Sequence, residues 1–270
     1  MNKFLSYITL FLCASITLTS CTSDDATEEA LDKKLEVLEG KNTVTFNFDH
    51  KMFGEDLKYD TFYKSNGNKE ELNITFLKYI ISNFQLTDDN GEVFTYPKNE
   101  GYFFVDSESN DFKVVLKDVP AGRYTGIKFG LGVDQEKYLR GVEDQQEFWD
   151  LCREHNLTWG WLTGYKFINC QGFFTSAGSE ADDFQLHIGS HGSKLDNYRE
   201  VVLTTKDVVK VSDKYAATVE LDVEVSKLLD DKNKISLVER QYIMVDKDRA
   251  PKIMENAVNM FSLKEVKITE

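Results

Sequence analysis

Apolar and polar residues alternate along most of this chain, which is the pattern of half-buried β-strands. Residues 44–50 place Val, Phe, Phe and finally His50 on one face, so His50 is predicted to point inward. Residues 112–116 and 127–131 alternate in the same way on either side of a Pro-Ala-Gly turn at 120–122, which predicts two paired antiparallel strands. Further strands are predicted at residues 77–87, 184–189, 201–205 and 219–225.

Turn and helix signals complete the prediction of the fold. Residues 88–91, Asp-Asp-Asn-Gly, tolerate the left-handed backbone of a tight hairpin turn. Helical patterns are confined to residues 145–155 and 250–261. The sequence therefore predicts an all-β fold, an antiparallel β-sandwich with a few short helices. No internal repeat is present, which argues against a solenoid or a propeller.

The N-terminal residues have the features of an export signal. Residues 1–20 combine a short polar start with an apolar run, and are predicted to be a lipoprotein signal peptide. Residues 18–21, Leu-Thr-Ser-Cys, resemble a lipobox, so Cys21 is predicted to carry the lipid; cleavage as an ordinary secretory signal is the alternative. Residues 21–41 are expected to form an acidic tether and residues 42–270 a single domain. The expected location is lipid-anchored at the outer membrane, on its periplasmic face or the cell surface, in a Bacteroidetes-type bacterium.

Charge and cysteine content narrow the set of partners and cross-links. The formal net charge of -14, with no basic cluster, argues against nucleic acid or anionic lipid as a partner. Once the export signal and the lipidated residue are set aside, Cys152 and Cys170 remain in a compartment that permits disulfides. They are predicted to form a disulfide that closes a loop around the tryptophan segment. A pair of metal-binding thiolates is the alternative.

Sequence signatures of common enzymes are absent. The chain after Cys21 contains no G-x-S-x-G elbow, P-loop, H-E-x-x-H helix, EF-hand loop or C-x-x-C pair. Separated Ser, His and Asp residues, or a pair of acids, could still converge in the fold, but no local pattern selects them. The protein is therefore expected not to be an enzyme.

The candidate chemistry lies in four histidines and a tryptophan pair. Trp159 and Trp161 are two residues apart, so in an extended segment both rings lie on one side. His187 is predicted on the polar face of a strand, His191 in a Gly-Ser turn and His155 in a polar run before the tryptophans. Taken singly, each of these three histidines reads as an ordinary solvated side chain.

An ordered series of segments changes this interpretation. The segments are residues 45–50, 77–86, 119–124, 129–134, 159–161, 164–167, 186–189 and 260–263, and they extend over nearly all of the predicted domain. Together they resemble the copper-binding proteins of the MbnP and CorA type. These are exported β-rich domains of methanotrophs, also found as lipoproteins in Bacteroidetes.

The resemblance implies a copper site made by two histidines and a tryptophan, which a di-haem partner of the cytochrome c peroxidase type can oxidise to kynurenine. Matched motif by motif, the ligands are His50 and His187, with Trp159 or Trp161 as the third contact or modified residue. His191 and His155 are reserves. Imidazole ligands suit copper, and Cu(I), which accepts low coordination numbers, is expected rather than Cu(II). Zinc is the nearest competitor.

Two segments depart from the family pattern. Residues 145–156 look like an insertion before the tryptophan motif. Residues 264–267, Lys-Glu-Val-Lys, stand where relatives often carry a histidine, which puts copper affinity in question.

The expected function is that of an exported copper-binding lipoprotein for copper acquisition or handling. The alternative is a metal-free cell-surface module that binds glycan or protein through exposed aromatic side chains. The two hypotheses differ in geometry, because copper binding requires His50, His187 and one tryptophan ring to converge, whereas their location at opposite ends would favour the binding module.

Overall fold

The computed structural model of this chain describes residues 36–64 and 66–270. The predicted signal peptide, the lipidation site Cys21 and most of the predicted tether lie outside the described residues. Residues 38–270 form a compact unit. None of the described helices is long and apolar enough to cross a membrane.

The compact unit is built from two β-sheets. The smaller sheet has the strand order β14-β12-β1-β2, and β7 also pairs with β1. Its strands are β1 (Lys41–Met52), β2 (Glu55–Asp56), β7 (Lys113–Pro120), β12 (Ala216–Glu224) and β14 (Phe261–Thr269). Alternation along β1 and β12 buries every second side chain, as the sequence predicted.

The larger sheet has the order β11-β8-β4-β9-β10-β13, with β3, β5 and β6 also pairing with β4. Its strands are β3 (Phe62–Tyr63), β4 (Glu70–Asp88), β5 (Val93–Thr95), β6 (Tyr102–Asp106), β8 (Gly122–Leu131), β9 (Ile168–Ser176), β10 (Asp182–Ile188), β11 (Arg199–Val211) and β13 (Tyr242–Ile243). The predicted turn at residues 88–91 connects β4 to β5, where Gly91 N donates to the Asp88 carbonyl oxygen.

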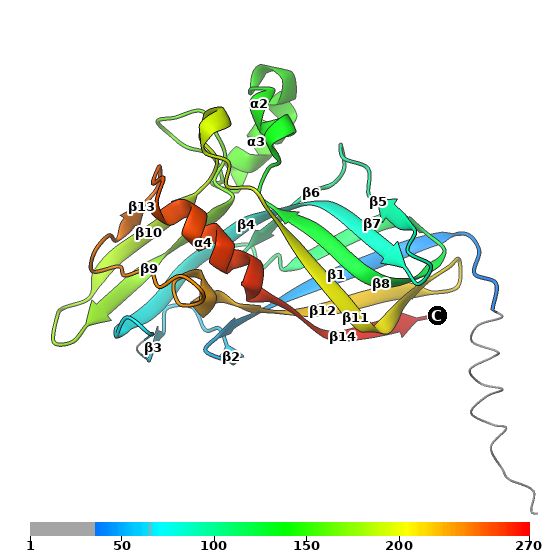
Figure 1. Cartoon of the computed structure of the whole chain (residues 1–270), viewed down its shortest axis with the longest axis horizontal. Helices are drawn as coiled ribbons and strands as arrows, with labels where there is room; N and C mark the ends of the chain where they lie inside the picture. Colours follow the sequence, from blue (N-terminus) through cyan, green and yellow to red (C-terminus); the bar gives the residue numbers. More distant parts are fainter. Residues whose placement is uncertain (1–35, 65) are drawn as a thin grey trace, which may run out of the picture. The chain divides into compact units, whose positions relative to one another are not determined.

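Helices are few, as predicted. The α-helices in the described residues are α2 (Gln135–Leu139), α3 (Gln146–Glu154) and α4 (Arg249–Ala257). The 3-10 helices are η1 (Glu143–Gln145), η2 (Gly192–Lys194), η3 (Val225–Leu228) and η4 (Val258–Met260). The predicted helix at 145–155 is confirmed as α3, while the one at 250–261 ends early because β14 begins at Phe261. Figure 1 shows α4 lying against β10.

The two sheets pack face to face through aromatic side chains. Phe48 of β1 lies with its ring 6.2 Å from that of Tyr79 in β4 and 6.4 Å from that of Phe129 in β8. Phe46 and Phe84 make a closer pair across the same interface, at 4.8 Å. This interface is the main core, and both of its faces come from alternating strands.

The prediction of purely antiparallel sheets is wrong in two places. β1 runs parallel to β12, and β10 runs parallel to β13, so both sheets are mixed. Parallel neighbours need a long connection, and the chain supplies one by building most of the larger sheet between β1 and β12.

The predicted pairing of residues 112–116 with 127–131 is also wrong. β7 pairs with β1 in the smaller sheet, whereas β8 pairs with β4 and β11 in the larger one. The Pro120–Gly122 turn therefore carries the chain across the sandwich. It is held there by two hydrogen bonds, from Ala121 N to the Gly40 carbonyl oxygen and from Tyr124 Oη to the Pro120 carbonyl oxygen.

The predicted disulfide between Cys152 and Cys170 is not formed, and both are free, buried thiols. Asn169 donates to the backbone carbonyl of Asn156, just beyond α3, so its side chain faces the helix. Cys170 is the next residue along β9 and faces the other way, into the core between the sheets. The sheet therefore separates Cys170 from Cys152, which lies in α3.

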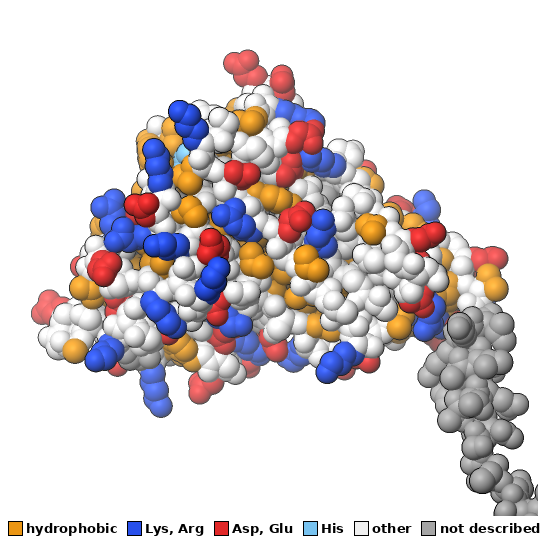
Figure 2. Space-filling model, viewed as in Figure 1, with side chains coloured by type: hydrophobic (Ala, Val, Ile, Leu, Met, Phe, Trp, Pro, Cys, Tyr) orange, Lys and Arg blue, Asp and Glu red, His pale blue; other side chains and the backbone are white. Residues whose placement is uncertain are grey.

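Charged side chains of both signs are spread over the face of the molecule seen in Figure 2. On the outer side of the smaller sheet, Lys264 lies 2.8 Å from Asp49, and Lys51 lies 2.7 Å from the same carboxylate. Such exposed pairs contribute little stability each, so they mark a solvated face.

We expect alkylation of the native protein to leave Cys152 and Cys170 unmodified, because burial shields both thiols and raises the pKa of each. After denaturation without reductant, both should react fully. Peptide mass spectrometry measures the modification at each position. A linked Cys152–Cys170 peptide in the unreduced sample would contradict this result.

Candidate functional site

The tryptophan segment begins at the C-terminal end of α3, which closes with a left-handed residue. Asn156 has φ 57°, a conformation that Asn tolerates better than most residues. Leu157 N donates to the Cys152 carbonyl at 2.7 Å and Asn156 N to the Arg153 carbonyl at 3.0 Å. This is the Schellman pattern of helix termination, and it turns the chain sharply away from the helix.

The segment then folds back on itself. Thr158 and Tyr165 form a β-bridge, Trp159 N donates to the Gly164 carbonyl at 3.3 Å, and Lys166 N donates to the Leu157 carbonyl at 2.8 Å. We call residues 157–166 the tryptophan loop. Its base is defined by backbone hydrogen bonds, so no disulfide is needed to hold it.

The end of β10 passes close to this loop. Phe167 N donates to the Ile188 carbonyl at 2.6 Å. A Cβ placed on Gly189 would lie 2.0 Å from the Tyr165 carbonyl oxygen, so only glycine permits this approach. The close contact brings His187 and His191, on either side of Gly189, up to the loop.

Three aromatic rings surround Trp159, which is 4% exposed. Its ring centroid lies 5.8 Å from that of His187, 5.4 Å from His191 and 5.6 Å from Trp161. Trp161 is 65% exposed and caps this group on the solvent side. We call Trp159, His187 and His191 the histidine–tryptophan cluster. The structure thus brings together His187, the reserve His191 and one tryptophan.

His50 does not join this cluster. Its Nε2 lies 3.0 Å from the Tyr79 hydroxyl, and its ring contacts that of Phe112 at 5.0 Å. Tyr79 pairs with Ile168 of β9, whereas His187 pairs with Asn169, the next residue. Adjacent residues of a strand face opposite sides, so the larger sheet lies between His50, inside the sandwich, and His187, outside it.

His155 is held at a separate position on the outer side of the sheet. Its Nδ1 lies 2.8 Å from Asp106 Oδ2, and its ring stacks on Phe104 at 4.5 Å. Asp106 is in turn 2.8 Å from the buried ammonium of Lys78. These contacts tie His155 to the Lys78–Asp106 ion pair and give its ring a structural role.

A chain of amide side chains orients the His187 ring. Asn169 Nδ2 donates to the Asn156 carbonyl at 3.0 Å, which leaves Asn169 Oδ1 to accept from Gln171 Nε2 at 2.9 Å. The same Gln171 nitrogen lies 3.0 Å from His187 Nε2. Gln171 therefore donates to that ring nitrogen, which requires a neutral imidazole with its proton on Nδ1.

Burial keeps both histidines of the cluster neutral near pH 7. Desolvation, with a smaller contribution from the positive charge of Lys166, lowers the pKa of His187 to about 4. Desolvation also lowers the pKa of His191. Neutral imidazole is the form that binds metal ions.

The cluster contains buried nitrogen atoms without hydrogen-bond partners. Among the described residues, His191 Nδ1 and Nε2 and Trp159 Nε1 are all buried and unpaired. An unsatisfied buried polar atom costs about 1–3 kcal/mol, so three together favour an occupant that supplies partners. No group of three or more His, Cys, Asp or Glu side chains gathers in the described part of the chain, so a site here has at most two such ligands.

Lys166 lies at the base of the loop, beside the cluster. It is 6% exposed; its Nζ donates to Asn156 Oδ1 at 3.2 Å and lies 6.0 Å from the centre of the Trp159 ring. Burial, with repulsion from Lys78, lowers its pKa to about 8, so the side chain is mainly charged at pH 7.

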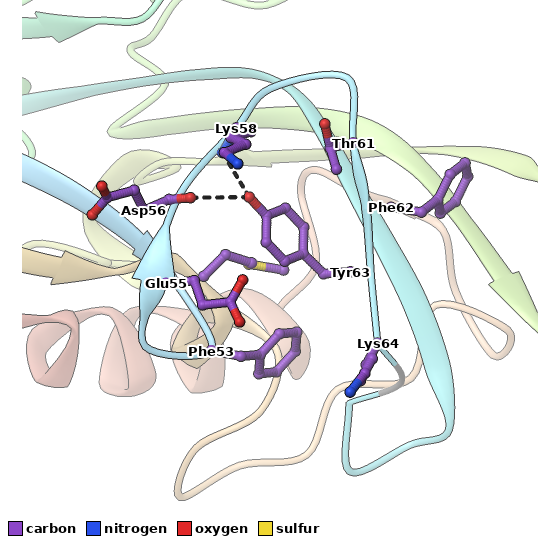
Figure 3. A pocket seen from close by; sticks show the side chains of 9 residues that line it. Phe53, Glu55, Asp56, Lys58, Thr61, Phe62, Tyr63 and Lys64 are labelled. Carbon is purple, nitrogen blue, oxygen red and sulfur yellow. Dashed lines mark hydrogen bonds between the residues drawn. The ribbon is translucent and has the colours of Figure 1, made fainter.

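The pocket beside the β1–β2 turn does not contain the aromatic and histidine side chains of the cluster. This pocket, of about 430 Å³, is lined by Phe53, Glu55, Lys58, Tyr63 and their neighbours (Figure 3). In it, the Tyr63 hydroxyl accepts from Lys58 N at 2.6 Å and donates to the Asp56 carbonyl at 3.2 Å. None of the four histidines lines this pocket.

Sequence reasoning did not single out Gln171, Asn169 or Lys166 as parts of the site. Gln171 and Asn169 lie on the polar face of β9, which the sequence alone would predict to be solvent-exposed. In the fold, the tryptophan loop covers this face at both residues. Lys166 was visible only as a residue of the family motif.

Comparison with known proteins identifies relatives of this fold. A family model described as MbnP matches residues 41–248. A solved structure, MbnP from Methylosinus trichosporium, superposes with a TM-score of 0.51 and 15% sequence identity, covering 85% of this chain and 99% of that chain. At this identity the superposition supports the fold alone. No curated protein matches the chain.

We expect replacement of Asn156 to destabilise the protein in two separable steps. Asn156→Gly keeps the left-handed turn but loses the side-chain hydrogen bond, at a cost of about 1 kcal/mol. Asn156→Ala should cost about 1–2 kcal/mol more, because alanine disfavours positive φ. Urea unfolding measures both. Equal stabilities of the two variants would show that the backbone conformation is not the constraint.

His50 should make stability depend on pH. Desolvation lowers the pKa of His50 to about 4, against about 6.5 in the unfolded chain. The stability it contributes is therefore complete above pH 6.5 and is lost as the pH falls toward 4. In His50→Phe, the slope of unfolding free energy against pH over this range should decrease by about 1.4 kcal/mol per pH unit. Tyr79→Phe, which keeps the histidine, should retain the slope, and an unchanged slope in His50→Phe would contradict the assignment.

Proposed function

The chain belongs to the MbnP family, as its sequence motifs predicted, and on this basis we propose that it binds and handles copper at the histidine–tryptophan cluster. His187 and His191 supply the ligands, and Trp159 supplies the adjacent indole. The observation that carries this proposal is that two neutral imidazoles flank one buried tryptophan, with nitrogen atoms of His191 and Trp159 left unpaired.

The donor set fits Cu(I) better than other metal ions. Two neutral nitrogen ligands suit the low coordination number that Cu(I) accepts. Structural zinc usually takes four ligands, and calcium and magnesium take carboxylate oxygens. His191 is unpaired and can bind directly, whereas copper at His187 Nε2 would take the place of the Gln171 hydrogen bond.

Trp159 rather than Trp161 is the proposed third contact and the proposed site of oxidation to kynurenine. Trp159 is buried and contacts both imidazoles, while Trp161 is mostly exposed and meets the Trp159 ring edge to face. A di-haem partner of the cytochrome c peroxidase type, as the family resemblance implies, would approach from the Trp161 side. Exposed Trp161 is also the residue that a metal-free binding module would use.

We propose that the protein is exported, anchored through lipid on Cys21, and binds copper for acquisition or handling without turning over a substrate. The N-terminal sequence pattern supports the anchor.

We expect the purified protein to bind stoichiometric Cu(I), and the His187→Ala, His191→Ala double variant to lose it. Mutation of a residue that only hydrogen-bonds to a metal ligand already lowers metal affinity by about 10–100-fold. Loss of both ligands should therefore abolish binding. Competition with a chromophoric Cu(I) chelator measures affinity, and circular dichroism checks the fold.

Two single variants serve as controls. His50→Phe and His155→Ala each remove a histidine that lies away from the cluster, so both should keep wild-type copper affinity. Loss of copper in His50→Phe, with retention in the double variant, would transfer the site to His50 and overturn this proposal.

A further inference from the structure

A buried positive charge stands beside a set of neutral candidate ligands. Lys166 is 6% exposed, and its ammonium lies 6.0 Å from the centre of the Trp159 ring. The only hydrogen bond of the ammonium within the described residues is to the neutral amide of Asn156. The positive charge acts on His187, since it disfavours protonation of that imidazole.

No neighbouring acid neutralises Lys166. Within the described residues, no carboxylate oxygen is recorded within 4.0 Å of its ammonium. The nearby acids Asp106 and Glu108 are both bound to Lys78, at 2.8 and 2.7 Å. The cluster itself contributes two imidazoles and an indole, none of which carries a charge when a metal binds. An incoming cation therefore meets an uncompensated positive charge.

We propose that Lys166 is a specificity-determining residue, which makes the cluster select Cu(I) over Cu(II) through its charge. The inference rests on the proposed copper site and adds to it the residue that decides the oxidation state bound. It is independent of the ligand count, because it concerns a group that does not touch the metal.

The charge of Lys166 affects the binding of Cu(I) and of Cu(II) by amounts that are related to each other. Repulsion between the ammonium and a bound ion is proportional to the charge of the ion, so it is twice as large for Cu(II) as for Cu(I) at the same position. If removal of the charge raises Cu(I) affinity by a factor f, it raises Cu(II) affinity by f squared. For a charge several ångströms away in a partly buried site, f is on the order of ten.

A structural role for Lys166 predicts a different result. Its hydrogen bond to Asn156 joins the base of the loop to the end of α3, so its loss could loosen the site. Loosening would weaken the binding of both ions. Charge removal instead strengthens both, and strengthens Cu(II) more.

The test compares Lys166→Met and Lys166→Gln in the full protein. Both remove the charge, and glutamine keeps a hydrogen-bond donor. Lys194→Gln is the matched control, because Lys194 lies three residues after His191 but is exposed, so water screens its charge. Affinities are measured by chelator competition, without oxygen for Cu(I) and in air for Cu(II).

We expect about tenfold tighter Cu(I) binding and about hundredfold tighter Cu(II) binding in both Lys166 variants, and no change in Lys194→Gln. Equal changes for the two ions, weaker binding, or failure of both variants to fold would overturn the proposal and leave Lys166 as a structural residue. If wild-type protein binds neither ion, or binds copper that survives loss of His187 and His191, the proposed site itself fails and this inference fails with it.

Discussion

The left-handed turn at Asn156 is the constraint on which the rest of the site depends. This one residue ends α3 and sends the chain into the tryptophan loop. Its carbonyl oxygen orients Asn169, and through Gln171 the ring of His187, while its side-chain oxygen holds the ammonium of Lys166. A helix terminus thus sets the position of a histidine and of a buried charge at once, although neither belongs to the helix.

The larger sheet is covered on its inner face and, beside the tryptophan loop, on part of its outer face, and this decides which chemistry each residue meets. The inner face packs on the smaller sheet and holds His50 against Tyr79. The outer face is covered by α3 and the tryptophan loop and carries His187 beside Trp159. Neighbouring residues of one strand therefore lie in two different environments. One is the apolar core, and the other is a polar cluster in which some buried nitrogen atoms have no hydrogen-bond partner.

Sequence patterns predicted the family and the strands β1, β4, β7, β8, β10, β11 and β12, because alternation and motif order are local properties of the chain. They missed β9 and β14. They did not predict which sheet a strand joins. β7 and β8 alternate as a hairpin would, yet the turn at residues 120–122 divides them between the sheets. The same limit explains why the predicted disulfide between Cys152 and Cys170 is not formed. It also explains why His50 and His187, which the motifs predicted as joint ligands, lie on opposite sides of the larger sheet. Alternation gives the side of a strand on which a residue lies, but the layer that covers that side comes from distant segments.

The parallel pairing of β1 with β12 has a consequence for the order of folding. β1 comprises residues 41–52, but one of its two long neighbours is not present until residues 216–224 have been made. Such long-range pairing is slow to form, because the entropic cost of closing the loop comes before any stabilising contact is made. The smaller sheet is therefore expected to close late, after most of the larger sheet has assembled. A chain truncated before residue 216 would keep the tryptophan loop and every strand of the larger sheet except β13, while leaving the apolar face of β1 open to aggregation.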